Sequence, residues 1–253
     1  MKLILSGEGP SDLGSSVLGE CGESFMPGPM AWIVDRLLQA FHTTYSLIEN
    51  HSAGADCIVY VNETRLASFA KQGSTLLPGI KYGKGNSFYA RNAQCLGLFS
   101  KSVSARDPDT LLIAVLFRDG DGTNANKQWS QKVESMCRGF ELAEFQTGVP
   151  MVPNPKSEAW MICALRSPPY TNCASLEEES GNDISKNPLK EQLKSLCGCS
   201  NPSAEDQAEW VREGRVNPVL IDRPSFSMFK KRLHLAAQNA GLADLRPIEV
   251  GNH

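Results

Sequence analysis

The sequence lacks any long apolar run. The amino terminus, MKLILSGEGPSD, turns polar after a few apolar residues, which is too short for the core of a signal peptide or for a membrane span. No later stretch of the chain is long enough to cross a bilayer either. We therefore expect a cytoplasmic protein that makes no membrane contact.

A large charge excess and the common catalytic motifs are also missing. The formal net charge of −3 over 253 residues gives the chain no overall attraction to nucleic acid, so any such binding has to be local. There is no Gly-x-Ser-x-Gly turn of a serine hydrolase and no Gly-x-x-x-x-Gly-Lys-Ser/Thr loop of an ATPase. The four histidines stand in no recognisable motif; they are His42, His51, His234 and His253.

Eight cysteines are scattered along the chain without a secretory signal before them. Such scatter favours reduced thiols over a disulfide framework. Cys197-Gly-Cys199 is accompanied by no second pair of cysteines or histidines at the spacing of zinc ligands. We interpret it as a loop.

Apolar periodicity predicts alternating strands and helices up to about residue 165. Strands are expected at residues 3–5, 58–61, 111–117 and 149–152, and helices at residues 30–45, 64–72, 86–104, 127–145 and 157–165. The seven apolar residues 111–117 are typical of a strand buried on both faces, so this strand is expected to be central. The alternation predicts an α/β fold with a mostly parallel sheet flanked by helices.

The composition changes after residue 165. Residues 167–186 hold two prolines and the acidic run Glu177-Glu178-Glu179, a pattern typical of an exposed loop. Three helices are expected after it, at residues 188–196, 204–213 and 225–240. We therefore expect an α/β domain at residues 1–165, and an acidic loop with a small C-terminal helical appendage at residues 166–253.

Carboxylates follow three of the expected strands. Glu8 and Asp12 follow the first, Asp119 and Asp121 follow the central strand, and Glu158 follows the next. Loops at the carboxyl ends of parallel strands meet at one edge of the sheet, where ligands bind. Mg²⁺ (or Mn²⁺) prefers such oxygen ligands, and two such ions can promote phosphodiester hydrolysis. Asp12 is explained equally well as a helix cap or turn residue.

Three segments resemble the TOPRIM fold, particularly the small stand-alone TOPRIM-like proteins related to OLD-family nucleases. These segments are Gly7-Glu8-Gly9-Pro10-Ser11-Asp12, the Asp119-x-Asp121 pair, and Pro155-Lys156-Ser157-Glu158-Ala159-Trp160. The resemblance covers residues 1–165 and implies a Rossmannoid metal-binding domain. It implies that Glu8, Asp119 and Asp121 hold Mg²⁺, with Asp12 and Glu158 as further members of the site. It also implies a nuclease, a DNA-binding hydrolase that serves in antiviral defence against phage beside a partner ATPase.

The spacing from Asp12 to Asp119 exceeds that of a minimal TOPRIM domain, which predicts an insertion around residues 65–106. This insertion contains seven Lys or Arg residues and no Asp or Glu. Basic side chains beside aromatic ones suit nucleic acid, so Lys81, Lys84 and Arg91 are the expected contacts. A basic face that covers the acidic site or a partner subunit is an equal alternative.

Arg118 and Lys156 each come just before a proposed site carboxylate. They are expected either to offset its charge and stabilise a pentavalent phosphate, which makes Lys156 a candidate catalytic residue, or to form surface ion pairs.

Two other functions fit parts of the pattern. Asp119-Gly-Asp121-Gly-Thr123 matches the opening motif of haloacid-dehalogenase-like phosphatases, in which the first Asp attacks phosphorus. Those enzymes need a later acidic pair after a buried strand, where residues 219–222 offer only Asp222. The second alternative is a non-catalytic metal-binding subunit of a larger complex.

Overall fold

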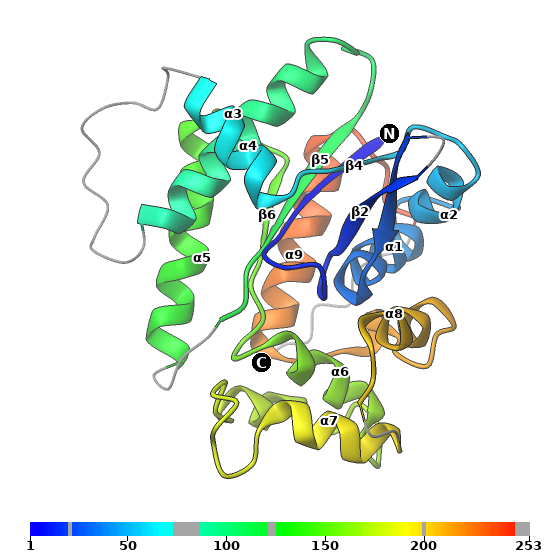
Figure 1. Ribbon diagram of the computed structural model, residues 1–253, viewed down its shortest axis with the longest axis vertical. Helices are drawn as coiled ribbons and strands as arrows, with labels where there is room; N and C mark the ends of the chain where they lie inside the picture. Colours follow the sequence, from blue (N-terminus) through cyan, green and yellow to red (C-terminus); the bar gives the residue numbers. More distant parts are fainter. Residues whose placement is uncertain (20–21, 73–86, 121–124, 199–200, 246–253) are drawn as a thin grey trace.

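The computed structural model describes residues 1–19, 22–72, 87–120, 125–198 and 201–245. Within these residues, four strands form a wholly parallel sheet in the order β4-β1-β5-β6. Helices cover both faces of this sheet (Figure 1), so the predicted α/β architecture is confirmed as a Rossmann-like arrangement. The strands are β1 (Lys2–Ser6), β4 (Ile58–Tyr60), β5 (Leu112–Phe117) and β6 (Gly148–Met151).

Strand β5 is buried along its whole length, as the apolar run predicted. It lies between β1 and β6. Its residues alternate between the two faces: Ile113 and Val115 belong to one hydrophobic cluster, and Ala114 and Leu116 belong to the other. A strand needs apolar side chains on both faces when helices cover both.

The helices divide into two groups, one for each face of the sheet. The first face packs against α3 (Glu63–Gln72), α4 (Ser87–Ser104) and α5 (Ala125–Leu142). The other face packs against α1 (Pro29–Phe41), α2 (Leu47–Ser52), α6 (Ser157–Leu165), α7 (Leu189–Cys197), α8 (Ala204–Arg212) and α9 (Pro224–Asn239), together with the short 3-10 helices η1 (Cys173–Glu177) and η2 (Pro218–Leu220). None of the helices in the described part of the chain has the length and apolarity needed to cross a membrane.

The loop expected after β1 contains an antiparallel hairpin, β2 (Gly14–Gly19) and β3 (Gly22–Pro27), which the sequence did not reveal. Its strands are rich in Gly and Ser, so they lack the apolar alternation that predicts a strand. Gly14 has a φ of +114°, and a Cβ there would collide with the carbonyl oxygen of Met26. Because the hairpin returns the chain to its start, the Met30 amide donates to Asp12 O.

The expected C-terminal appendage is part of the main core. Trp160 of α6 contacts Phe226 and Phe229 of α9, with ring centroids 4.8 and 5.7 Å apart. All three side chains are almost fully buried, in the same cluster as Leu3 and Leu5 of β1. The correction has a simple cause: α8 and α9 carry large apolar side chains that help to cover one face of the sheet.

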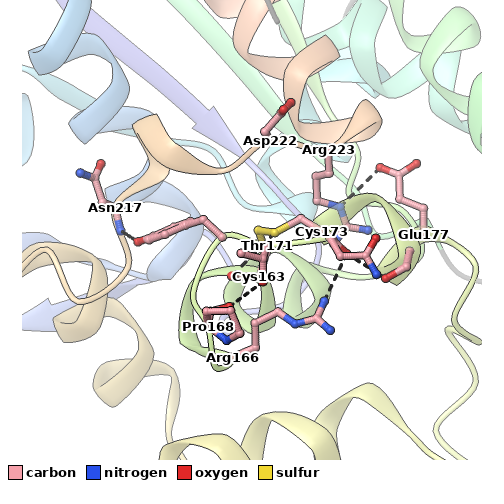
Figure 2. The surroundings of a disulfide bond; sticks show 12 residues. Cys163, Arg166, Pro168, Thr171, Cys173, Glu177, Asn217, Asp222 and Arg223 are labelled. Atoms are coloured by element: carbon pink, nitrogen blue, oxygen red, sulfur yellow. Dashed lines mark hydrogen bonds and ion pairs between the residues drawn. A yellow bond between two sulfur atoms is a disulfide. The ribbon is translucent and has the colours of Figure 1, made fainter. Parts of the chain in front are cut away.

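The segment after α6 is also less exposed than expected. Cys163 of α6 and Cys173 of η1 form a disulfide, which corrects the expectation of reduced thiols for these two residues (Figure 2). The turn between them reverses the chain, so residues ten apart in sequence meet. Glu177, expected in an exposed acidic run, is buried and pairs with Arg223 at 3.4 Å. Cys57, Cys95 and Cys137 are free thiols.

Candidate functional site

The order of the strands reverses direction between β1 and β5. After β1 the chain forms β4 on one side of β1, and it later forms β5 on the other side of β1. In open α/β sheets the loops separate at such a point and leave a crevice for ligands. Glu8 and Asp119 each stand two residues beyond the ends of these strands. The two acids therefore stand at this point of the sheet, just beyond the ends of neighbouring strands.

Hydrogen bonds join the loops that follow β1, β5 and β6. The Asp119 amide donates to Glu8 Oε1 at 2.9 Å. The Ser157 amide, in the first turn of α6, donates to Asp119 Oδ1 at 3.1 Å. The Ser157 hydroxyl donates to Asp12 Oδ1 at 2.7 Å. The structure thus brings Glu8, Asp12 and Asp119 to one edge of the sheet, with Ser157 as a link that sequence analysis did not assign.

Glu158 and Asp12 are two carboxylates in a poorly solvated environment. Burial raises the pKa of both, and the charge of Asp12 raises the pKa of Glu158 further. Glu158 Oε2 is buried and has no hydrogen-bond partner among the described residues. A buried carboxylate without a partner is costly in its ionised form, and a bound cation removes that cost. Either a proton or a cation at this edge removes the cost.

Two lysines lie beside these carboxylates and share one acidic partner. Lys156 Nζ is 3.1 Å from Asp183 Oδ1, and Lys190 Nζ is 2.9 Å from Asp183 Oδ2. The hydrogen bond from Lys190, followed by that from Lys156, lowers the pKa of Asp183. The charges of both lysines partly offset the raised pKa values of Asp12 and Glu158. The alternative of an ion pair for Lys156 is thus observed.

Arg118 is almost fully buried, so it is no surface residue. Its Nη2 lies 3.1 Å from Glu63 Oε1 of α3, and its Nε lies 4.0 Å from Glu8 Oε2. Its guanidinium also lies over the Phe88 ring of α4, 5.7 Å from the ring centroid. Burial lowers the pKa of Arg118, and the charges of Glu8 and Glu63 oppose that shift. Arg118 therefore connects the Glu8 loop to helices α3 and α4.

Four predicted residues remain, and three of them fall outside the part of the chain that the structure describes. Asp121, Lys81 and Lys84 lie outside the described residues. Arg91 is exposed on α4. The predictions for these four residues stay as they were made.

The donor set suits Mg²⁺ in kind. This ion takes oxygen ligands and often needs only one or two protein carboxylates, because water and substrate phosphate complete its coordination. Glu8 and Asp119 supply that number. No three of the described site carboxylates bring their oxygens within 4.8 Å of one another, so the described acids do not form a compact set of three ligands.

A group of three side chains with ligand atoms within 4.8 Å of one another lies elsewhere. It consists of His42, His234 and Asp244. Sequence analysis missed it, since the two histidines stand 192 residues apart and share no motif.

The region around Asp222 bears on the phosphatase alternative. Residues 218–220 form the 3-10 helix η2 instead of a buried strand. Asp222 lies just before α9, and its Oδ1 accepts a hydrogen bond from the Ser227 hydroxyl of α9 at 3.3 Å. Asp222 is therefore at no strand end of the described sheet.

Comparison of the chain with family models, with curated proteins and with solved structures gives no match.

Proposed function

We propose that the carboxyl edge of β1 and β5 binds Mg²⁺ or Mn²⁺ and hydrolyses phosphodiesters of nucleic acid, as in TOPRIM-like nucleases. The hydrogen bond between the Asp119 amide and Glu8 Oε1 carries the proposal. It holds two strand-end acids together at the place where an open α/β sheet binds its ligands. Glu8 keeps 40% of its side chain exposed, so its carboxylate is available to a ligand.

Glu8 and Asp119 would hold the ion, and Asp12, Asp121 and Glu158 are the further acids of the proposal. When bound, the metal makes its water a stronger nucleophile and neutralises charge on the phosphate. Ser157 positions Asp12 and Asp119 through its hydroxyl and its amide. Arg118 orients the Glu8 carboxylate from its buried side.

Positive groups beside the acids favour a phosphate substrate. The amino terminus of α6 points its first amide at Asp119, and such a terminus attracts anions. Lys156 and Lys190 add two cations next to Glu158. An acidic site flanked in this way suits a metal ion together with a phosphodiester, because each offsets the charge of the other.

The proposal also includes a partner ATPase and a role in antiviral defence, which follow from the family resemblance alone. It includes a cytoplasmic location, which follows from the sequence alone.

The test is a cleavage assay with plasmid and single-stranded DNA in Mg²⁺ or Mn²⁺. Glu8→Gln and Asp119→Asn are expected to lower the rate at least about 100-fold, the scale seen when one electrostatic contact to a transition state is removed. Glu63→Gln is the matched control, since Glu63 contacts the same arginine but follows β4 and not β1 or β5. It should cleave at close to the wild-type rate.

Normal cleavage by Glu8→Gln would refute the site. Hydrolysis of p-nitrophenyl phosphate that needs Asp119 but not Glu8 would point instead to the phosphatase chemistry. Activity that appears only with an added ATPase partner, and is still lost in Glu8→Gln, would support the site and assign the chain to a complex.

A further inference from the structure

A second cluster of ligand-type side chains joins three segments that are distant in sequence. His42 ends α1, His234 lies on α9, and Asp244 lies in the chain after α9. One ligand atom from each lies within 4.8 Å of the other two. Neighbouring contacts place the cluster near the amino edge of the sheet: Gly241 lies against Leu111, the residue before β5. It is thus far along the strands from Glu8 and Asp119.

The two imidazoles are hydrogen-bonded to each other through their inner nitrogens. His234 Nδ1 and His42 Nε2 are 2.9 Å apart, so one proton lies between them. Both outer nitrogens face oxygen atoms. His42 Nδ1 is 3.3 Å from Ala243 O and 3.4 Å from Asp244 Oδ1, and His234 Nε2 is 3.7 Å from Asp244 Oδ2.

A count of protons shows what this arrangement lacks. Two neutral imidazoles carry two N–H protons, and the inner hydrogen bond uses one. A single proton is left for two outer nitrogens, although both face oxygens. In either tautomer one outer nitrogen then has no proton to share with its nearest oxygen, at 3.3 Å for His42 Nδ1 or at 3.7 Å for His234 Nε2, which is unfavourable. One additional cation at the pair removes the conflict.

A metal ion between the inner nitrogens satisfies every group. It takes the place of the shared proton, so both outer nitrogens keep an N–H and donate to Asp244 and Ala243 O. Metal-bound histidines usually donate their second N–H to a carboxylate or carbonyl in this way. Zn–N bonds of 2.0–2.1 Å at a tetrahedral angle place two nitrogens about 3.3 Å apart, so the rings need to separate by about 0.4 Å and to rotate until both lone pairs point at the ion.

A proton is the other cation that resolves the conflict, and titration with Zn²⁺ distinguishes the two. The choice of metal follows from the ligands, since imidazole nitrogen suits Zn²⁺, Cu²⁺ and Ni²⁺ whereas Mg²⁺ prefers oxygen. The chemistry of this cluster therefore differs from that of the carboxylate edge.

We propose that His42 and His234 bind one divalent transition-metal ion of the Zn²⁺ class, with Asp244 as the carboxylate that orients them. Such an ion would tie α9 and the chain after it to the end of α1, where the Leu245 amide already donates to Phe41 O at 2.7 Å. The side chains of His234 and Asp244 are 21% and 41% exposed, which leaves room for water to complete the coordination.

The test follows the imidazole nitrogens of the full chain by ¹⁵N NMR. The protein is first treated with a chelator and then titrated with Zn²⁺. We expect one equivalent to shift the signals of His42 and His234 and to leave His51 unchanged, and we expect Mg²⁺ to have no such effect. Zn²⁺ should also raise the melting temperature of the wild-type protein. Both measurements use the wild-type protein, so they test the proposal even if a substitution prevents folding.

Variants then assign the ligands. His234→Gln should weaken Zn²⁺ binding at least about 10-fold, and Asp244→Asn should weaken it by roughly 10-fold as the loss of an orienting carboxylate. His51→Gln is the matched control, because His51 is outside the cluster and bonds to Ala55 O. Glu8→Gln should also bind Zn²⁺ normally, which separates this proposal from the carboxylate site. Co²⁺ in place of Zn²⁺ should show no thiolate charge-transfer band.

Three results would overturn the proposal. The first is Zn²⁺ affinity unchanged in His234→Gln. The second is a thiolate band with Co²⁺, which would place the ion at cysteines. The third is a pair of histidine signals that respond to pH but not to Zn²⁺, which would make the cluster a proton-binding pair only.

Discussion

Arg118 and Arg223 are two buried arginines that face carboxylates, yet their surroundings differ. Both side chains are at most 1% exposed, and burial is the main cause that lowers the pKa of each, in Arg223 to about 10. The partner of Arg223 is Glu177, whose side chain is 9% exposed. The partners of Arg118 are Glu8 and Glu63, which are 40% and 51% exposed.

The carboxylates show the difference most clearly. Glu177 accepts from Arg223 Nε, from the Ser225 amide at 2.6 Å and from Asn154 Nδ2 at 3.2 Å. Among the described residues, Glu8 accepts one hydrogen bond, at Oε1 at 2.9 Å, and its Oε2 has Arg118 Nε at 4.0 Å as its ion-pair partner. A carboxylate whose acceptor positions are filled stabilises the fold, whereas one with an exposed open oxygen is able to bind a ligand. The comparison thus indicates a structural role for the Glu177 pair and leaves the Glu8 carboxylate open to the ligand that we propose.

The largest expected effect on stability is at the Arg223–Glu177 pair. Glu177→Gln leaves a buried guanidinium without its countercharge, which should lower the free energy of unfolding by about 3–5 kcal/mol. Urea denaturation measures this loss. The neighbouring exposed residue provides the control, and Glu178→Gln should change stability by no more than about 0.5 kcal/mol. A loss below about 1 kcal/mol for Glu177→Gln would remove the distinction between the two pairs.

The disulfide close to this pair should have the next largest effect. Replacing both Cys163 and Cys173 with Ala removes a crosslink that closes a loop of about ten residues, with an expected loss of about 2–3 kcal/mol. Thermal or urea unfolding of the wild-type protein in a strong reductant should show a similar loss. Since Cys197 is disulfide-bonded as well, the double variant should respond to reductant less than the wild-type protein does, and an equal response would contradict the pairing.

At the open edge a substitution should stabilise the fold. The folded-state pKa of Glu158 is raised, so its ionised form opposes folding at neutral pH. Glu158→Gln should therefore gain about 0.5–2 kcal/mol at pH 7 without metal. The gain should shrink as pH falls through the folded pKa and vanish below the ordinary value of 4.5, where the acid is protonated in both states. A gain that does not change with pH would rule out ionisation as its cause.

The smallest effect on stability is expected at Glu8. Glu8→Gln keeps an oxygen for the Asp119 amide, and Arg118 keeps Glu63, so the loss should stay within about 1 kcal/mol. The same variant is expected to lose cleavage. Melting temperature and cleavage rate, measured on one preparation, separate the two roles. A large loss of stability would make Glu8 a structural residue like Glu177.

Sequence patterns predicted the elements whose signal is local. The apolar run at residues 111–117 and the periodic helix at residues 157–165 are found as β5 and α6. The strand-end rule also led to the acids that the structure brings to one edge, because parallel strands deliver their loops to the same side. The identification of a metal site there stays a prediction.

Other features depend on contacts that leave no local pattern. The Gly- and Ser-rich hairpin has no apolar alternation, and the burial of Arg118 depends on helices that arrive from elsewhere in the chain. His42 and His234 meet only because α1 and α9 pack on the same face of the sheet. Such sites become visible when the distances between side chains are known.

The most direct test of the central claim is Mn²⁺ binding, followed by the loss of the free-ion EPR signal. The Mn²⁺ titration is best made with the His234→Gln protein, so that the histidine cluster does not contribute to the measured binding. The account predicts binding that excess Mg²⁺ displaces, an affinity at least about 10-fold weaker after Glu8→Gln or Asp119→Asn, and no change after Glu63→Gln. Equal affinity in the Glu8→Gln and Glu63→Gln proteins would contradict a metal site at the carboxyl edge of the sheet.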